Sequence, residues 1–336
     1  GRELKHVVGP KMGHKYDPAS QAKILDFVGK ALKKGRERFP LQLSLQTPTL
    51  KHNRMRWVLL TGLQEHWKES RVDAVFHREL GTVSIKTVNV SSLIVVNPNV
   101  SCCSKLHAFD LTIDEDLVKV PPSSFSIPLT RSKTGSWTIG SPPPGLRKKH
   151  GLQGPIDDAF LSRFLVVTPD VASGNEMIDQ WMAFEIDHLR KRWRELFRGD
   201  LPMKKASEVT ETDRLTSHLV LWGTPKSNSL IAEVVAELPV RWKGDQVLAG
   251  KQSFSSKHHL PVLIYPNPLN PRKYVVLNSG PTFREAHDRT NSLQNPKLPD
   301  WAILDVSQPP DGQAAGKVVA TDFFDERWSL KPARTD

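Results

Sequence analysis

His6-Val-Val-Gly-Pro-Lys-Met-Gly-His14-Lys-Tyr-Asp-Pro18 joins an apolar run to a segment with helical periodicity. The apolar run, which begins at Leu4, is typical of a strand, and the glycine and proline after it end that strand. His14 follows in a loop that these residues can bend sharply. Beyond Pro18 the apolar residues recur at helical spacing, at Ala22, Ile24, Leu25, Val28 and Leu32. The pattern predicts a strand, a histidine-bearing loop and a helix.

A histidine between a strand and a helix is where an α/β-hydrolase carries its general base. The chain order in that fold is nucleophile, acid, histidine, so both partners of His14 would precede it. No Gly-x-Ser-x-Gly motif is present, and the run Gly135-Ser-Trp-Thr-Ile-Gly140 lacks its spacing. We therefore predict His14 to be a catalytic histidine whose partners lie elsewhere. The structural alternative is a loop histidine hydrogen-bonded to backbone.

Besides the run 6–18, five stretches carry a resemblance: Asn53-Arg-Met-Arg-Trp57, Gly154-Pro-Ile-Asp-Asp-Ala-Phe160, Leu219-Val-Leu-Trp-Gly223, Ile264-Tyr-Pro-Asn-Pro-Leu-Asn-Pro271 and Asn278-Ser-Gly280. Together they resemble large bacterial proteins of the prolyl-oligopeptidase-like (S9-type) serine peptidase or esterase group. The run 6–18 resembles the end of the catalytic domain, and the later stretches resemble a long C-terminal extension. The resemblance implies a peptide or ester substrate, an upstream hydrolase domain and a catalytic role for His14.

Length and composition are those of a globular protein with two or three domains. The chain has 336 residues, of which 38% are hydrophobic and 25% charged. It starts at Gly1 without a signal peptide and has no apolar stretch long enough to span a bilayer, so we expect a soluble piece of a longer protein and no membrane partner. The adjacent Cys102 and Cys103 predict no disulfide framework. The compartment stays open; a signal peptide upstream would imply secretion or a periplasmic location.

The formal net charge of +11 raises the question of nucleic-acid binding. The basic residues, however, gather in short groups within 30–38 and 190–194, where cations suit the ends of helices, and within 147–150. No stacking-aromatic motif accompanies them. We interpret them as solvated faces and predict no nucleic-acid partner.

Periodicity divides the rest of the chain. Residues 40–139 contain many short runs with apolar residues at every second position, which predicts a β-sandwich. Residues 140–150 are rich in Pro, Gly and basic residues and predict an exposed linker. Residues 151–330 alternate helical segments with continuous apolar runs, which predicts a Rossmann- or flavodoxin-like three-layer α/β domain. With residues 1–39 as the end of a hydrolase domain, the predicted fold class is multidomain α/β plus β.

Within 151–330 we predict apolar strands at 164–167, 219–222, 262–265, 274–277 and 302–306. A long helix is predicted to follow the capping-box spacing of Ser173-Gly-Asn-Glu176 and to stop at Gly199. A second helix is predicted over 230–237. The proline-rich run 266–271 is interpreted as a rigid connection between strands.

Polar residues follow two of these strands. If strands 219–222 and 274–277 are parallel neighbours, Thr224, Ser227, Asn228, Asn278 and Ser279 would line one crevice at their carboxyl ends. A helix start there would favour a neutral polar or anionic ligand. The alternative is that Ser227 or Asn228 caps the following helix. Neither a Walker loop nor a dinucleotide fingerprint is present, so no cofactor is predicted.

Two other pairs receive a structural interpretation. The neighbours Asp157 and Asp158 point opposite ways on an extended chain and do not predict one acid-base site. The neighbours His258 and His259 have no third ligand at motif spacing, so no metal is predicted.

Two functional hypotheses remain. In the first, the chain is the C-terminal part of a serine hydrolase, supplies His14 and is inactive alone. In the second, it is a noncatalytic module that binds a substrate or another protein. An independent small-molecule enzyme in 151–330 lacks any motif in its favour.

Overall fold

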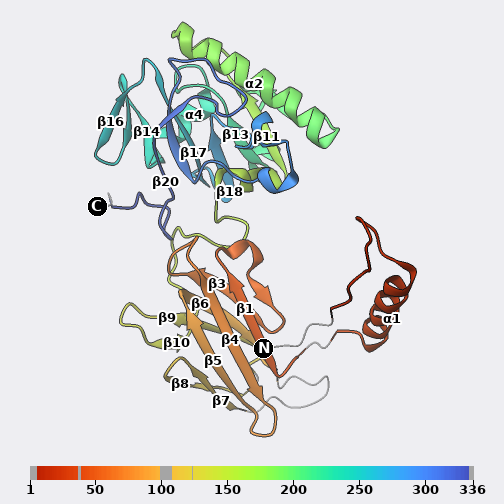
Figure 1. Ribbon diagram of the computed structural model, residues 1–336. Coiled ribbons are helices and arrows are strands. Elements are labelled where there is room, and N and C mark those ends of the chain that lie inside the picture. Colours follow the sequence, from red (N-terminus) through yellow and green to blue (C-terminus); the bar gives the residue numbers. More distant parts are fainter. Residues whose placement is uncertain (1–5, 37–38, 99–107, 123, 333–336) are drawn as a thin grey trace.

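The computed structural model describes residues 6–36, 39–98, 108–122 and 124–332. These residues form, in chain order, a long helix, a β-rich domain and a mixed α/β domain (Figure 1). The α/β plus β character predicted from the sequence is therefore present. The predictions that concern Leu4, Cys102 and Cys103 lie outside the described residues.

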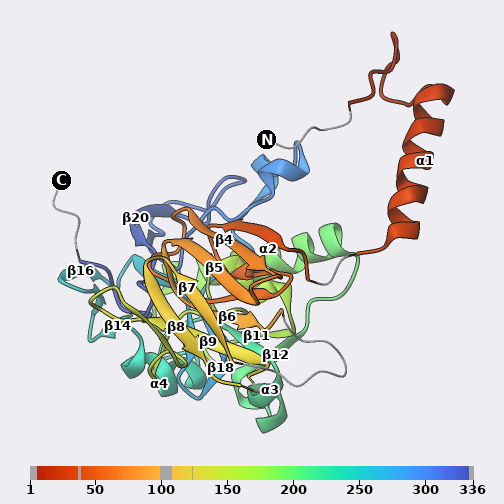
Figure 2. The ribbon, with the colours of Figure 1, turned by 90° about the horizontal axis from the view of Figure 1, so that it is seen from below.

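The N-terminal helix, α1 (Pro18–Lys34), begins where the sequence predicts. The Asp17 carboxylate accepts the backbone N–H groups of Ala19 and Ser20, which stabilises the first turn. The predicted strand before it is not formed, because residues 6–8 have no strand partner among the described residues. Figures 1 and 2, viewed at right angles, both show α1 standing apart from the two domains.

Two five-stranded sheets make up the β-rich domain, with the orders β1-β4-β5-β7-β8 and β10-β9-β6-β3-β2. Neighbours are antiparallel except β5 and β7. The strands are β1 (Gln42–Thr47), β2 (Arg54–Met55), β3 (Val58–Leu63), β4 (Ser70–His77), β5 (Thr82–Val88), β6 (Val90–Val96), β7 (Phe109–Ile113), β8 (Asp116–Val120), β9 (Ser126–Arg131) and β10 (Trp137–Ile139). Their buried side chains form one apolar cluster, so the sheets pack face to face as a sandwich.

The α/β domain is built on a seven-stranded sheet with the order β12-β11-β13-β18-β17-β19-β20. Neighbouring strands from β12 to β18 in this order are parallel, and neighbouring strands from β18 to β20 are antiparallel, so the sheet is mixed. These strands are β11 (Phe164–Thr168), β12 (Met203–Lys205), β13 (His218–Leu221), β17 (His259–Asn267), β18 (Asn270–Leu277), β19 (Trp301–Asp305) and β20 (Lys317–Asp322). The second sheet is antiparallel and consists of β14 (Val240–Lys243), β15 (Gln246–Ala249) and β16 (Gln252–Ser255).

Three helices accompany the large sheet: α2 (Glu176–Phe197), α3 (Glu211–Thr216) and α4 (Ser229–Val234). Apolar side chains of α2 and α4 join the core cluster of the sheet. The cap of α2 differs from the predicted capping box, because Asn175 is the N-cap, and its side chain accepts from the N–H of Ile178. The run 266–271 also differs from its interpretation as a separate connection, since most of it extends strands β17 and β18 up to a tight hairpin turn.

The connection between the domains is exposed over most of 140–147 but not at its end. Lys148 is buried, and its Nζ lies 2.6 Å from Oδ2 of Asp300, with both side chains 0% exposed. The same ammonium group lies 5.3 Å from the ring centre of Trp328. The prediction of an exposed linker is therefore wrong at Lys148, because a buried carboxylate on the α/β domain stabilises the charge there.

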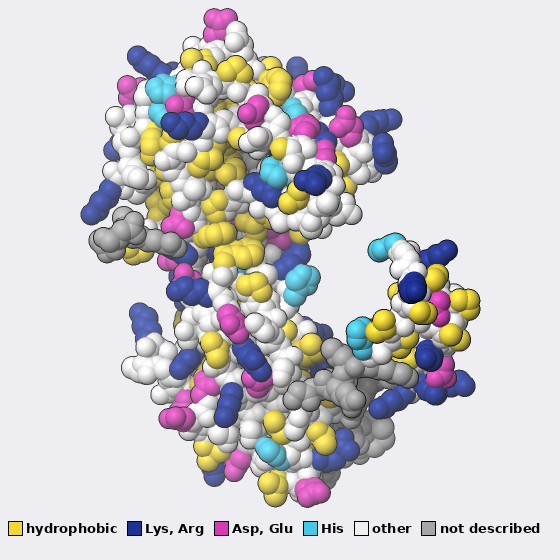
Figure 3. Space-filling view, viewed as in Figure 1, with side chains coloured by type: hydrophobic (Ala, Val, Ile, Leu, Met, Phe, Trp, Pro, Cys, Tyr) yellow, Lys and Arg dark blue, Asp and Glu magenta, His cyan; other side chains and the backbone are white. Residues whose placement is uncertain are grey.

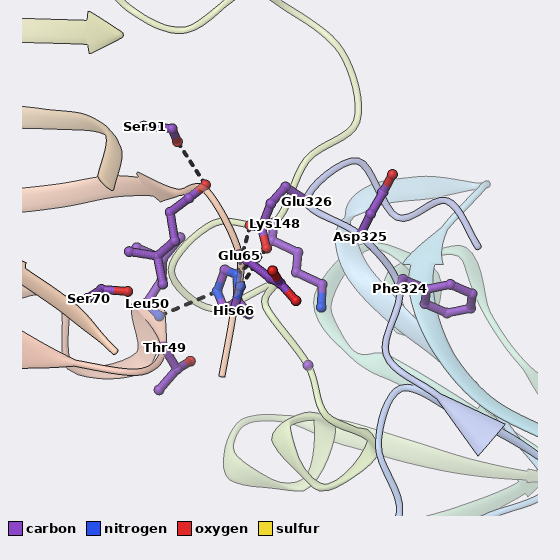
Figure 4. A network of polar contacts seen from close by, with 12 residues as sticks. Thr49, Leu50, Glu65, His66, Ser70, Ser91, Lys148, Phe324, Asp325 and Glu326 are labelled. Carbon is purple, nitrogen blue, oxygen red and sulfur yellow. Dashed lines mark hydrogen bonds and ion pairs between the residues drawn. The ribbon is translucent and has the colours of Figure 1, made fainter. Parts of the chain in front are cut away.

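Residues 323–331, which we call the strap, lie against both domains. Glu326 accepts hydrogen bonds from the backbone N–H and from Nδ1 of His66, at 2.8 and 2.7 Å (Figure 4). The rings of Phe323 and Trp67 lie 5.4 Å apart. Away from the strap, Lys51 of the sandwich pairs with Asp158 at 2.9 Å. Polar and aromatic contacts thus join the two domains.

Candidate ligand-binding crevice

A cavity of about 510 Å³ opens near the carboxyl ends of β11 and β13. The strand order reverses at this pair. From β11 the chain continues to β12 on one side, and it then returns to β13 and β18 on the other side. Open α/β sheets bind their ligands at such switch points, and the volume is within the usual range of ligand sites. We therefore take this crevice as the candidate site.

Four segments provide the walls of the crevice. They are the segment before α2 with its first turn, the turn after β13, the C-cap of α4, and the small sheet with its turns. The lining residues are Ser173, Gly174, Asn175, Ile178, Thr224, Pro225, Lys226, Val235, Trp242, Gly244, Asp245, Ser256 and Lys257.

Hydrogen bonds hold these walls in place. Nδ2 of Asn175 donates to the carbonyl oxygen of Lys257 at 2.8 Å, which ties the cap of α2 to the small sheet. The N–H of Ser256 donates to the carbonyl oxygen of Asp245 at 2.8 Å. The crevice is thus a preformed feature of the fold.

Its side chains favour a ligand with a negative charge and an apolar part. Lys226 and Lys257 are exposed and have no ion-pair partner in the described part of the chain, while Asp245 is the carboxylate among the lining residues. The half-buried indole of Trp242 offers a flat apolar surface. Two ammonium groups against one carboxylate leave a net positive charge for a carboxylate or phosphate group.

Only one of the five residues predicted to contact a ligand, Thr224, lines this crevice. The Ser227 hydroxyl accepts the N–H of Thr224 at 2.9 Å. Oδ1 of Asn228 accepts the N–H of Leu230 at 3.0 Å, and Nδ2 of Asn228 donates to the backbone carbonyl of Trp222 at 3.0 Å. Ser227 and Asn228 are buried, and their hydrogen-bonding groups act within the fold. The structural alternative, a helix cap, describes Asn228.

Asn278 and Ser279 lie apart from the crevice. Strands β13 and β18 are parallel neighbours, as the prediction assumed, and this brings Asn278 against Gly223. Oδ1 of Asn278 accepts the N–H of Gly223 at 2.8 Å, and Nδ2 donates to its carbonyl at 3.1 Å. Asn278 and Ser279 line a separate cavity of about 180 Å³ beside Arg284. The prediction of a single crevice lined by all five residues is therefore wrong. The buried side-chain amides of Asn228 and Asn278 are hydrogen-bonded to backbone groups instead.

His14 lies in an exposed loop before α1. Its imidazole has no hydrogen-bond or ion-pair partner in the described ranges. The nearby carboxylate of Asp17 is committed to the cap of α1. The catalytic role of His14 therefore remains a prediction.

A serine and a histidine do meet in the α/β domain, at Ser162 and His218. Nε2 of His218 lies 2.7 Å from Oγ of Ser162, while Nδ1 accepts the backbone N–H of Tyr274 at 2.8 Å. Burial lowers the pKa of His218 to about 4, so the ring is neutral at pH 7. Because Nδ1 accepts, the proton is on Nε2, which donates to Ser162. His218 in this tautomer cannot take the serine proton, and the pair is structural.

The aspartates 157 and 158 have different partners, as the sequence predicts. Asp157 accepts from the hydroxyl of Thr282 at 2.6 Å, and burial raises the pKa of Asp157 to about 6. Asp158 accepts from Nζ of Lys51 and from the hydroxyl of Tyr274, which is 2.8 Å away. The two carboxylates support separate parts of the fold.

Among the crevice residues that sequence analysis missed are Trp242, Asp245 and Lys257. Trp242 lies on β14, and Asp245 and Lys257 lie on turns of the small sheet, whose three strands were not predicted. The run Trp-Lys-Gly-Asp before Val247 carries a hairpin signal that could have located two of them.

Figure 3 shows Lys and Arg scattered among acidic side chains on the visible face. None of the described helices has the length and apolar character needed to cross a bilayer. Comparisons of the chain with protein-family models, curated proteins and solved structures find no match.

Proposed function

We propose that this chain supplies His14 to a serine hydrolase of the prolyl-oligopeptidase-like type, and that both following domains are noncatalytic. The observation that carries the proposal is the exposed apolar face of α1. Its Leu25, Val28 and Leu32 side chains are 62%, 43% and 76% exposed, although their i, i+3, i+7 spacing is that of a helix with a buried side. In a hydrolase, this face would pack on the catalytic sheet and hold the His14 loop beside its partners.

The chemistry of this role requires a serine and a carboxylate, neither of which contacts His14 within the described ranges. A serine would donate its proton to Nε2, and a carboxylate would hold Nδ1–H. Because both would come from a hydrolase domain outside this sequence, the chain alone should not hydrolyse p-nitrophenyl esters. Measurable esterase activity of the isolated chain, abolished by His14→Ala, would contradict this.

The decisive test uses a longer protein that carries the hydrolase domain. His14→Ala should lower kcat by roughly 10³-fold or more, the scale of a triad residue, with an unchanged circular dichroism spectrum. Lys15→Ala, the neighbouring exposed residue, is the matched control and should retain turnover. Retention of turnover in His14→Ala would remove this residue from the mechanism.

The crevice supports a second function, binding of an anionic ligand by the α/β domain. The two unpaired lysines and Trp242 favour a peptide that ends in a free carboxylate, a group that a peptidase produces. Calorimetry should detect binding of a short aromatic peptide with a free C-terminus and weaker binding of its C-terminal amide. Lys226→Ala and Lys257→Ala should weaken binding, whereas Lys243→Ala on the neighbouring strand should not. Equal affinity for acid and amide would contradict the proposal.

A further inference from the structure

We propose that His258, His259 and Asp305 bind one divalent transition-metal ion, which ligand chemistry identifies as Zn²⁺. Their ligand atoms all lie within 4.8 Å of one another. Two imidazoles and one carboxylate are a donor set that Zn²⁺ uses with three protein ligands, leaving a further position for water or substrate. The site is separate from His14 and from the crevice lining.

The backbone explains how neighbouring histidines reach the same ion. His258 is the last residue of the turn after β16, and His259 is the first residue of β17. Successive side chains of a regular strand point to opposite faces of the sheet, which would separate the two rings. His258 precedes the strand, so this alternation does not apply to its side chain. Their ring centres lie 4.2 Å apart.

Asp305 is the third ligand and comes from a neighbouring strand. It ends β19 and is the direct cross-strand partner of His259. The N–H of Val306 donates to the carbonyl of His258 at 2.9 Å, which fixes the turn against the same strand end. Sequence spacing could not reveal this set, since a strand pairing supplies its third member.

Hydrogen bonds orient the donor atoms as in metal sites. Nδ1 of His259 lies 2.9 Å from the carbonyl oxygen of Ser255 and must donate to it, which leaves the lone pair on Nε2. Oδ1 of Asp305 accepts the N–H of Ser307 at 2.9 Å, which holds the carboxylate in place at the end of β19. Neither ring nitrogen of His258 has a hydrogen-bond partner in the described part of the chain. Each residue therefore offers one available ligand atom.

A bound ion would join the start of β17 to the end of β19. Zinc–ligand distances of about 2.0–2.2 Å place neighbouring ligand atoms about 3.3 Å apart in a tetrahedron, so the three side chains would draw together. The turn that carries His258 also carries Lys257 of the crevice, so the ion would fix one crevice wall.

Titration of the EDTA-treated, dialysed chain with Co²⁺ alone tests the site. We expect one ion per chain with visible ligand-field absorption that Zn²⁺ abolishes by displacement. At a hundredfold excess of Zn²⁺ over its Kd, the melting temperature should rise by roughly 5–10 °C.

Two isosteric variants locate the ion. His258→Gln and Asp305→Asn should each weaken binding at least tenfold, and circular dichroism will report whether they remain folded. His52→Gln, an exposed histidine of the sandwich, is the matched control and should bind as the unmodified chain does. Absence of Co²⁺ absorption overturns the proposal. So does binding that survives both variants, since the ion would then occupy other residues.

Discussion

Replacing Lys148 with methionine tests the buried charge pair at the domain junction. Methionine fills similar space beside Trp328 but removes the ammonium group from Asp300. The carboxylate would keep one hydrogen bond, from the N–H of Phe324 at 2.9 Å, while its Oδ1 already has no partner among the described residues. Removal of one member of a buried pair costs about 3–5 kcal/mol because the remaining charge is left uncompensated. We expect a loss of this size in the free energy of unfolding at pH 7.

Urea unfolding followed by far-UV circular dichroism measures this loss. The variant Lys149→Met removes the neighbouring, exposed ammonium group and should change stability by less than about 0.5 kcal/mol. Adding Asp300→Asn to Lys148→Met should recover part of the loss, because the uncompensated charge disappears. A loss below about 1 kcal/mol for Lys148→Met would refute the argument that this pair is buried and interdependent.

Three further outcomes are expected. Trypsin should remove α1 before it cuts either domain, a result that gel analysis and mass spectrometry will check, because the helix stands apart with exposed lysines. The pKa of His218, lowered by burial to about 4 from 6.5, means that the unfolded chain binds its proton first as pH falls; the stability of the unmodified chain relative to His218→Asn should therefore drop by about 2 kcal/mol between pH 6.5 and 4 in chemical denaturation. The raised pKa of Asp157 acts in the opposite direction but equally in both proteins, so it cancels. Gly223→Ala should cost about 1–3 kcal/mol in thermal or urea unfolding, since φ is +124° and an added Cβ would lie 2.6 Å from Oγ of Ser227, whereas Gly29→Ala in α1 meets open space and should cost nothing.

Continuous apolar runs made the central strands predictable from sequence. The runs 164–167, 219–222 and 274–277 correspond to β11, β13 and the end of β18, because strands covered on both faces need apolar residues at every position. Strand β20 could not be predicted in this way. It lies at the edge of the sheet and keeps mostly polar or exposed residues, so its pattern resembles that of a loop.

The candidate site was predictable only in its position. The rule for open α/β sheets indicated the turn after 219–222, and Thr224 does line the crevice. In a sequence, a polar residue after a strand has the same pattern whether it contacts a ligand or bonds to the backbone. The ligand contacts predicted for Asn228 and Asn278 were therefore wrong. Lys148 shows the same limit, since its partner Asp300 is 152 residues away in the sequence.

The strap also has a consequence for the order of events during synthesis. Its Glu326 contacts His66, 260 residues earlier, so this contact can form only after both domains have been made. The sandwich and the α/β core can each gather their own apolar clusters first, since domains generally fold as units and the N-terminal one folds first. On the ribosome, residues 323–331 would therefore dock after both cores have gathered, and they would add their contacts to the one that Lys51 makes with Asp158.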